Sequence, residues 1–212
     1  ATMPPRFITF EGLDGSGKST HVGRAARWLE EHGARVRTTY EPGGTRLGQA
    51  VRELFLDPQH AGMDGTVETL LLFASRRQHL REVIEPALAA GEHVLCDRFT
   101  DSTLAYQGCG RGVPLAVIRA ADELATGGRR PDITLLFDVP AELAHRRRGA
   151  STGDRLDAET LAFYERVRRG YLDLAEQEPA RFRVIRAAGE LAATDAQVRA
   201  ALAGLAGPGD GG

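Results

Sequence analysis

The sequence has 212 residues, an apolar fraction of 42% and a formal net charge of −2. This charge excludes general electrostatic attraction to nucleic acid or to a membrane surface, and no apolar run reaches the roughly 18 residues that a membrane span needs. The two cysteines, Cys96 and Cys109, are too few for a disulfide framework or a cysteine-rich metal site, and they predict a protein of the reducing cytoplasm.

Strand and helix patterns alternate along the chain, without a repeat or a long linker. Strands are predicted at 6–12, 35–40, 92–99, 131–140 and 181–187. Helices are predicted at 18–34, 45–56, 67–91 with a bend or end near Pro86, 115–128, 141–149, 156–178 and 194–206. The alternation predicts one α/β domain over residues 1–212, in which helices cover both faces of a parallel sheet. The glycine-rich end, 206–212, is expected to fray.

Four segments with polar or turn-forming residues come where predicted strands end: the loop at 12–19, Glu41–Gly44, Asp97–Phe99 and Asp138–Pro140. Ligands of doubly wound sheets bind at the carboxyl ends of the strands. These segments are therefore expected to meet along one edge of the sheet. Asp138 is expected to cap the helix that follows it, because Val-Pro-Ala-Glu comes directly after it.

Residues 12–19, GLDGSGKS, match the pattern G-x-x-x-x-G-K-[ST] between a predicted strand and a predicted helix. Backbone N–H groups of such a loop bind phosphate oxygens, and the helix N-terminus adds its dipole. Lys18 is expected to reach the β- and γ-phosphates, and the Ser19 hydroxyl to bind Mg²⁺. The predicted nucleotide-binding residues are Gly12, Leu13, Asp14, Gly15, Ser16, Gly17, Lys18, Ser19 and Thr20.

The dipeptide Asp97-Arg98 bears on what kind of nucleotide protein this is. At the end of a strand beside the loop, Asp97 is expected to hold Mg²⁺ directly or through water. A bidentate arginine such as Arg98 suits an acceptor phosphate, which a kinase needs and a simple ATPase does not. The competing interpretation is an ordinary surface ion pair between the two side chains.

Six segments resemble bacterial thymidylate kinases in order and spacing: FEGLDGSGKST, EPGGT, LLLFASRRQH, CDRFTDSTLAYQGCGRG, RPDITLLFDVP and RRRGASTGDRLD. The resemblance spans residues 6–200, and the run Tyr106–Gly112 is its most specific part. It implies a P-loop NTPase fold, transfer of the γ-phosphoryl group of ATP to dTMP with Mg²⁺, a cytoplasmic location and a homodimer. A UMP/CMP kinase, or a nucleotide-dependent switch or partitioning protein, remains the alternative.

The resemblance also assigns an acceptor site between about residues 41 and 112. Arg98 would bind the dTMP phosphate, Arg76 the thymine carbonyl, and Phe73 would stack on the base. Counting back from Pro86 favours Arg76 over Arg77, and Phe73 is otherwise an ordinary core residue.

Four further residues are assigned by the same resemblance. Ser102 and Gln107 would bind the edge of the base, and Tyr106 would exclude a 2′-hydroxyl, unless it is simply a half-buried loop tyrosine. Pro42 would line the acceptor pocket. The family usually has arginine where this chain has Tyr40, so position 40 receives no role.

Some members of the family carry an arginine inside the phosphate loop, at the position of Gly15. This chain instead concentrates arginines between His145 and Arg155, in the segment that resembles a mobile lid at about 145–157. Arg148 and Arg155 are expected to stabilise the charge that develops during transfer, alongside Lys18 and Arg98. The alternative is a solvated basic helix end. No residue stands out as a catalytic base, since positioning and charge stabilisation suffice for this chemistry.

Asp14 places a carboxylate in an anion-binding loop. It either points to solvent, as aspartates in turns often do, or it faces the acceptor. The resemblance favours a hydrogen bond from the dTMP 3′-hydroxyl to this carboxylate.

Overall fold

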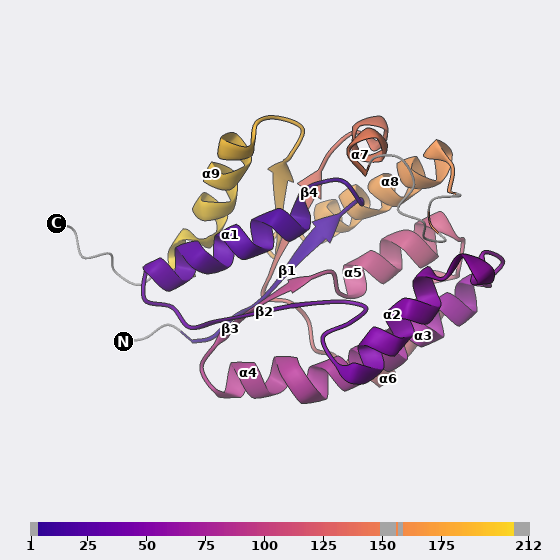
Figure 1. The fold of residues 1–212 in the computed structure, drawn as a ribbon, viewed down its shortest axis with the longest axis horizontal. Helices are drawn as coiled ribbons and strands as arrows, with labels where there is room; N and C mark the ends of the chain where they lie inside the picture. The colour runs from indigo at the N-terminus through magenta and orange to yellow at the C-terminus, as the bar shows by residue number, and fades with distance from the viewer. Residues whose placement is uncertain (1–3, 149–155, 157–158, 206–212) are drawn as a thin grey trace.

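The structure is a computed structural model, and it describes residues 4–148, 156 and 159–205. Within this part of the chain one parallel sheet has the strand order β2-β3-β1-β4-β5, which confirms the predicted fold class. The strands are β1 (Phe7–Gly12), β2 (Val36–Tyr40), β3 (His93–Asp97), β4 (Ile133–Asp138) and β5 (Phe182–Arg186). Their carboxyl ends lie at one edge, as Figure 1 shows by the arrowheads.

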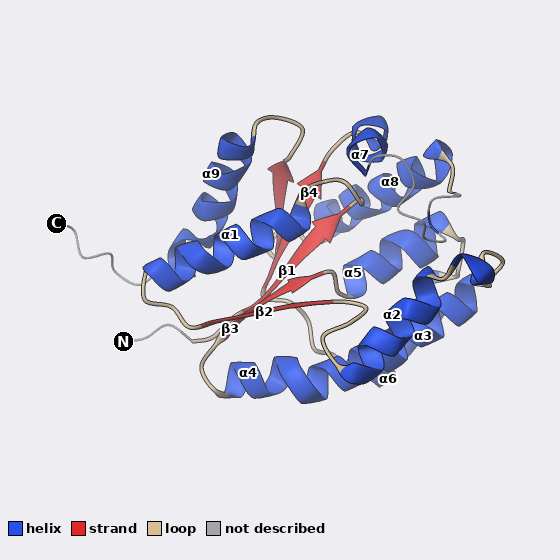
Figure 2. Ribbon diagram, viewed as in Figure 1, coloured by secondary structure: helices blue, strands red, loops and turns tan. Residues whose placement is uncertain are grey.

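Helices surround this sheet (Figure 2). They are α1 (Lys18–Glu31), α2 (Arg46–Leu56), α3 (Gly65–His79), α4 (Glu85–Ala89), α5 (Thr100–Thr103), α6 (Leu115–Thr126), α7 (Ala141–Arg148), α8 (Leu161–Gln177) and α9 (Leu191–Leu202). Short 3₁₀ turns lie at Pro58–His60 and Ala203–Leu205. Within the described residues, no helix combines the length and the apolar character that crossing a membrane requires.

The predicted helix at 67–91 is a composite of three parts. α3 runs into a π-helical turn, Leu80–Ile84, which leads into α4. Pro86 lies in the first turn of α4, where its missing N–H costs least. A second π-helical segment, Leu104–Gly110, follows α5 and includes residues 106–110 of the most specific run of the sequence, Tyr106–Gly112. Turns of this kind are frequent at functional sites.

The two faces of the sheet have different partners. α1 and α9 cover one face, whereas α4, α5 and α8 contact the other. Alternation along β1 sends Ile8 and Phe10 into the main apolar core, and Phe7 into a smaller cluster with Phe99. Glu11 shares the face of Phe7, so the strand delivers a carboxylate into the layer between the sheet and α5 and α8.

Candidate active site

The loop after β1 has the geometry of an anion cradle. Lys18 Nζ folds back to donate to the Leu13 carbonyl at 3.0 Å, and burial lowers the pKa of the lysine. Gly12, Gly15 and Gly17 all have positive φ, of 139°, 81° and 92°. Side chains rarely adopt this conformation, which explains why glycines occupy these positions.

The remaining loop residues differ in burial. The Ser16 hydroxyl is buried without a partner among the described residues, whereas Thr20 is exposed in the first turn of α1. An unsatisfied hydroxyl inside the cradle suits a phosphate oxygen.

The two predicted Mg²⁺ ligands lie together. Ser19 Oγ, in the first turn of α1, donates at 2.5 Å to Oδ2 of Asp97, the last residue of β3. A hydroxyl and a carboxylate are hard oxygen donors, and with phosphate oxygens they fit the incomplete protein shell that Mg²⁺ usually has. No cluster of three or more His, Cys, Asp or Glu side chains able to hold a metal occurs in the part of the chain that is described.

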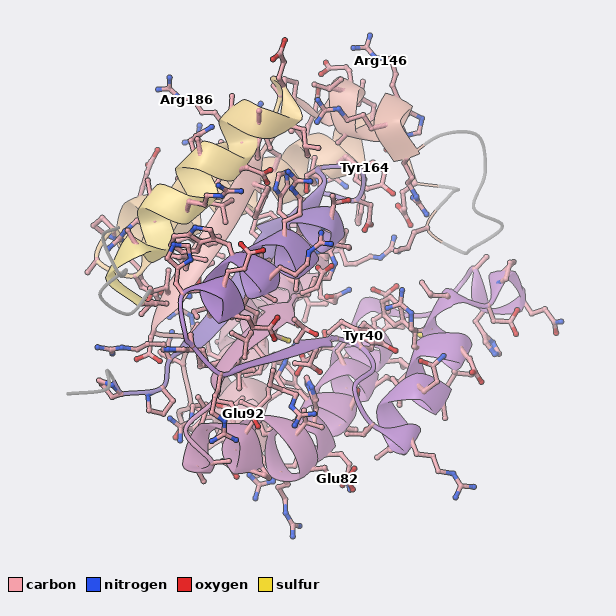
Figure 3. All side chains as sticks on the ribbon, turned by 60° about the vertical axis from the view of Figure 1, so that its left-hand side comes forward. Tyr40, Glu82, Glu92, Arg146, Tyr164 and Arg186 are labelled. Carbon is pink, nitrogen blue, oxygen red and sulfur yellow. The ribbon has the colours of Figure 1, made fainter. Side chains whose placement is uncertain are left out.

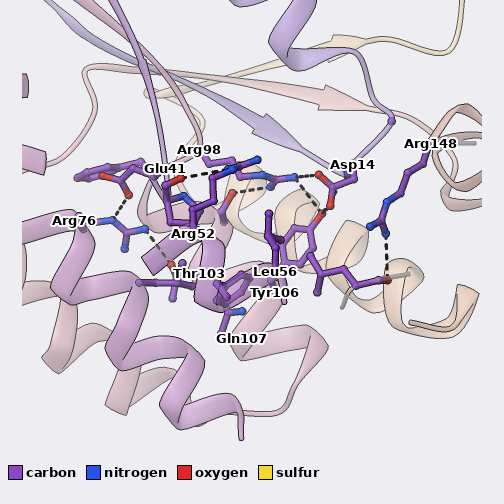
Figure 4. A pocket seen from close by; sticks show the side chains of 17 residues that line it. Asp14, Glu41, Arg52, Leu56, Arg76, Arg98, Thr103, Tyr106, Gln107 and Arg148 are labelled. Atoms are coloured by element: carbon purple, nitrogen blue, oxygen red, sulfur yellow. Dashed lines mark hydrogen bonds and ion pairs between the residues drawn. The ribbon is translucent and has the colours of Figure 1, made fainter. Parts of the chain in front are cut away.

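A cavity of about 320 Å³ opens beside the phosphate loop (Figure 4). It is lined by Asp14, Gly15, Glu41, Pro42, Arg52, Phe55, Leu56, Leu72, Arg76, Arg98, Phe99, Ser102, Thr103, Tyr106, Gln107, Arg148 and Leu156. Figure 4 shows Arg76 toward one end, Arg148 toward the other, and Arg98 and Asp14 between them. The cavity therefore has cationic groups along its length, with the phosphate loop at one side.

Arg98 lies in a strained backbone conformation, with φ of 73°, directly after β3. Its Nη1 donates to Ser102 Oγ at 2.9 Å and to the Tyr171 hydroxyl at 3.1 Å. Its Nη2 donates to Asp14 Oδ1 at 2.8 Å and to the Tyr106 hydroxyl at 3.3 Å. The guanidinium group is thus held on both sides at the cavity wall.

Arg76 is 2% exposed and defines the other end. Its Nε donates to Glu41 at 2.7 Å and its Nη2 to Thr103 at 3.1 Å, while its charge lies between the rings of Phe73 and Phe99, 4.7 and 4.9 Å from their centroids. Although burial opposes ionisation, Arg76 lowers the pKa of Glu41. Arg76 Nη1 is buried without a hydrogen-bond acceptor among the described residues. A ligand carbonyl would satisfy it.

Of the two residues of α3 that were expected at the acceptor site, Arg76 lies at the cavity and Phe73 does not. Arg76 lines the cavity, whereas Arg77 Nη1 points to the Ala125 carbonyl of α6 at 3.4 Å. Phe73 is 4% exposed and is absent from the cavity lining; its neighbour Leu72 lines the cavity instead. Phe73 packs on Arg76, and its stacking on a base stays a prediction.

The polar residues of the 102–107 segment also divide between the two ends. Ser102 lies with Arg98, and Thr103 lies with Arg76, so Thr103 rather than Ser102 is placed at the Arg76 end. Gln107 Nε2 donates to the fully buried Glu68 at 2.8 Å. Because the amide nitrogen is engaged there, the Gln107 carbonyl oxygen is the group that remains for a ligand.

Tyr106 and Asp14 form one unit with the phosphate loop. The Tyr106 hydroxyl donates to Asp14 Oδ2 and accepts from the Asp14 backbone N–H, both at 3.3 Å. Burial raises the pKa of Tyr106, so the hydroxyl keeps its proton. Burial opposes ionisation of Asp14, but Arg98 and then Lys18 hold its pKa well below the usual range. The Asp14 carboxylate faces the cavity, which contradicts the interpretation that it only points to solvent.

The arginine run at the end of α7 points in three directions. Arg146 projects away from the molecule (Figure 3). Arg147 donates to two carbonyls in the loop after β5, at 2.7 and 3.0 Å. Arg148 lines the cavity and donates to the Leu156 carbonyl at 3.1 Å and to the Tyr164 hydroxyl at 2.6 Å. Arg155 and most of the predicted lid lie outside the described residues.

Close packing explains Gly15. A Cβ at this position would lie 2.2 Å from the Ala144 carbonyl oxygen and 3.0 Å from the Arg148 nitrogen. α7 therefore occupies the space that an arginine of the loop would need. Asp138 does not cap α7, which begins at Ala141; its carboxylate pairs with Arg168 of α8 at 2.7 and 3.0 Å.

A second cavity, of about 910 Å³, continues the site along α1 and the ends of β2 and β3. Lys18, Ser19 and Asp97 line it, and it shares Asp14 and Arg98 with the first cavity. A phosphate bound by the loop and a group bound in the first cavity would therefore be neighbours.

Among the lining residues that sequence reasoning did not assign to the site are Glu41, Arg52, Leu72 and Thr103. Pro42, which was expected, lines the cavity, and its carbonyl accepts from Arg52 Nη1 at 3.2 Å. Glu41 precedes Pro42 in the quoted EPGG motif, so its acidic character at a strand end was an available signal. Leu72 and Arg52 carried none, because helical periodicity does not say which buried face borders a cavity.

Comparison with known proteins places these features in one family. The thymidylate kinase family model matches residues 10–198. Thymidylate kinase of Desulfosudis oleivorans is 48% identical over 204 residues, covering 92% of this chain and 95% of the relative. That of Chromobacterium violaceum is 50% identical over 195 residues, covering 91% of each. The crystal structure of thymidylate kinase from Ehrlichia chaffeensis is 39% identical, with a TM-score of 0.72 over 86% of this chain and 93% of that one. The chain therefore belongs to the thymidylate kinase family.

Proposed function

We propose that the protein transfers the γ-phosphoryl group of ATP to dTMP, giving dTDP for DNA synthesis. The observation that carries this proposal is the cavity with Arg76 at one end and Arg98 beside the phosphate loop. A nucleoside monophosphate has a carbonyl-bearing base at one end and a phosphate at the other, and this arrangement of donors complements it. Family membership supports the same activity.

The Arg76 end suits thymine. The unsatisfied Arg76 Nη1 would donate to the carbonyl at C4, and the Gln107 carbonyl would accept from N3–H. Leu72 supplies an apolar surface for the ring, in place of the expected Phe73. Cytosine presents an amino group at C4 and an unprotonated N3, so both contacts would be lost.

The other end suits the sugar and phosphate. Arg98 would bind the acceptor phosphate, Asp14 the 3′-hydroxyl, and Tyr106 would limit space at the 2′ position. Ser102 belongs to this end, as a support for Arg98.

The donor would lie across the loop. Its phosphates would be bound by the backbone of residues 12–19, by Lys18 and by the side chains of Ser16 and Thr20. Ser19 and Asp97 would hold Mg²⁺, which neutralises phosphate charge when bound. Arg148, and Arg155 outside the described residues, would supply the cation that Gly15 leaves out of the loop.

The test is an acceptor assay that couples ADP release to NADH oxidation, with ATP, Mg²⁺ and dTMP, dUMP, UMP or dCMP. dTMP should give the highest kcat/KM. Preference for UMP or dCMP would favour a UMP/CMP kinase. ATP hydrolysis that no monophosphate stimulates would indicate a nucleotide-dependent switch instead.

We also propose a homodimer in the cytoplasm. α3 packs beside α2 and α6, and these helices expose large apolar side chains, with Leu70 60% and Leu124 86% accessible. An apolar face of this kind favours a protein partner, here a second copy of the chain. The thiols of Cys96 and Cys109 are unpaired, which suits a reducing compartment.

A further inference from the structure

Glu11 is a buried carboxylate that lies behind the acceptor site rather than in it. It is the penultimate residue of β1, it has no exposed surface, and it does not line the cavity. Such a group is costly to bury unless hydrogen bonds hold it. Glu11 accepts three: from the Phe99 backbone N–H at 2.8 Å, from Ser102 Oγ at 2.5 Å and from the Tyr171 hydroxyl at 3.1 Å.

Two of these donors connect Glu11 to Arg98. The hydroxyls of Ser102 and Tyr171 both contact Oε2 of Glu11, and both also accept hydrogen bonds from Nη1 of Arg98. A hydroxyl has one proton. The two hydroxyls also lie 2.8 Å from each other, so one of them can donate to the other, but at least one proton goes to the ionised carboxylate. In either arrangement the protons point away from Arg98, and the oxygen lone pairs are directed toward the guanidinium group. Glu11 therefore makes both hydroxyls acceptors for Arg98.

The third donor fixes the backbone. The Phe99 N–H belongs to the peptide bond that follows Arg98. Arg98 has a φ of 73°, and among the described residues it is the one residue other than glycine with a positive φ. A conformation of this kind persists only where its surroundings hold it. Arg98 N–H donates to the Phe10 carbonyl at 3.0 Å, so β1 binds the strained residue on both sides, through Phe10 and through Glu11.

We propose that Glu11 is a positioning residue that holds Arg98 in the orientation that binds the acceptor phosphate. The proposal rests on the proposed function, because it needs a phosphate at Arg98. It differs from a purely structural role in one respect. Loss of a carboxylate that only stabilises the fold would weaken binding of the nucleoside and of the phosphate alike. Loss of Glu11 should weaken only the part of the affinity that the phosphate contributes.

The experiment compares dissociation constants of dTMP and thymidine by titration calorimetry, for the wild type and Glu11→Gln. The wild type should bind dTMP more tightly than thymidine. Glu11→Gln removes one oxygen acceptor, so the thymidine-to-dTMP ratio of dissociation constants should fall about tenfold. The Kd of thymidine itself should stay within about twofold of the wild type.

Two further variants separate positioning from general destabilisation. Asp195→Asn alters another buried carboxylate, which pairs with His21 at 2.7 Å, and it should leave the ratio unchanged. Arg98→Ala should lower the ratio by itself, and adding Glu11→Gln should lower it no further, because both changes act through the same guanidinium group.

If Glu11→Gln does not fold, Tyr171→Phe tests the same link, since it removes one bridging hydroxyl and keeps the carboxylate; its ratio should fall by a smaller factor. Equal weakening of thymidine and dTMP, or additive losses with Arg98→Ala, would overturn the inference alone. A wild-type protein that does not bind dTMP would overturn the proposed function, and this inference with it.

Discussion

At the scale of single residues, the acceptor site is a set of charges that restrain one another. Asp14 pairs with Arg98 at 2.8 Å, which is the contact that an acceptor phosphate would make with the same guanidinium group. Binding of dTMP would therefore exchange one anion for another at Arg98, and the released carboxylate would be free to accept from the sugar. The aspartate in the anion-binding loop is explained by its partner.

This exchange predicts a coupling between Asp14 and the 3′-hydroxyl. A charge-assisted hydrogen bond contributes about 1.5–3 kcal/mol, so wild-type kcat/KM should fall at least about tenfold when 3′-deoxy-dTMP replaces dTMP. In Asp14→Ala the two acceptors should converge, and Asp14→Asn should lie between. An equal penalty for the missing hydroxyl with and without the carboxylate would show that Asp14 does not bind it.

The proposed role of Arg148 in transfer is separable from substrate binding. Its guanidinium group lies at the loop end of the cavity, where negative charge would develop on the transferred group. Arg148→Ala should lower kcat by about 10²–10³-fold and ATP affinity much less, because the contact strengthens in the transition state. Steady-state kinetics measure kcat, and titration calorimetry measures the Kd of ATP.

Two variants control for indirect effects of Arg148→Ala. Arg146→Ala removes a neighbouring arginine that projects outward, and it should keep wild-type kcat. Tyr164→Phe removes one hydrogen-bond partner of Arg148 while keeping its charge. If Tyr164→Phe lowers kcat as much as Arg148→Ala does, the position of Arg148 rather than its charge alone is decisive. If Arg148→Ala keeps near-normal kcat, a residue other than Arg148 supplies the cation.

The ionisation of Glu11 predicts a pH dependence of stability. Burial, together with the charge of Asp101, raises the pKa of Glu11 to about 7 from 4.5. Between these values the native state keeps a proton that the unfolded state releases, so this group's contribution to the free energy of unfolding falls as pH rises from 4.5 to 7 and is constant above. Glu11→Gln should flatten that part of a Tm-versus-pH curve. A curve parallel to the wild type would contradict the shifted pKa.

At the scale of elements, α7 and the phosphate loop pack so closely that each fixes the other. Gly15→Ala would place a methyl group against the Ala144 carbonyl and would force a side chain to adopt φ of 81°. The change should displace α7 and lower kcat at least about tenfold, with a smaller effect on dTMP affinity. Gly62→Ala has no atom within 4 Å of its Cβ and should be silent in the same assay. Normal kcat in Gly15→Ala would show that transfer does not depend on the close packing of α7 against the phosphate loop.

Some elements of the fold could be predicted from the sequence and others could not. Alternating strand and helix patterns predicted the parallel sheet and the meeting of its strand ends, because both follow from local periodicity and chain direction. The π-helical segment Leu104–Gly110 was not predicted, since Gly108 and Gly110 disfavour a helix by local propensity. Arg76 was preferred over Arg77 by spacing, but that Leu72 rather than Phe73 lines the cavity depends on the rotation of α3 against its neighbours.

Glu11 is the clearest case of information that local sequence lacks. Its position in an apolar strand marks it as unusual, but its partners come from segments 88 to 160 residues away. Only the packing of α5 and α8 on the same face of the sheet brings Ser102 and Tyr171 to it. The motif thus predicts Arg98, whereas the hydrogen-bond network that holds Arg98 is seen only in the tertiary structure.

At the scale of the whole molecule, large apolar side chains are exposed on α2, α3 and α6, and the first two of these helices also line the cavity. α2 contributes Arg52 and α3 contributes Arg76, while Leu70 and Leu124 face outward from α3 and α6. Association through these helices would restrain α3 from its outer side. A dimer formed through this face would therefore support the Arg76 end of the cavity.

Disrupting this face should change both the molecular mass in solution and the KM for dTMP. Leu124→Glu places a charge on the most exposed large apolar side chain of the described residues, and it should convert the dimer to a monomer in sedimentation velocity at micromolar concentration. KM for dTMP should rise by several-fold, while kcat changes less, because α3 positions the base rather than the reacting phosphates. Leu191→Glu on α9 is the matched control: it is 50% exposed but lies against the other face of the sheet, so mass and KM should not change. A Leu124→Glu protein that stays dimeric, or a wild type that is monomeric, would remove this face as the interface. A monomeric variant with unchanged KM would show that the site does not depend on the dimer.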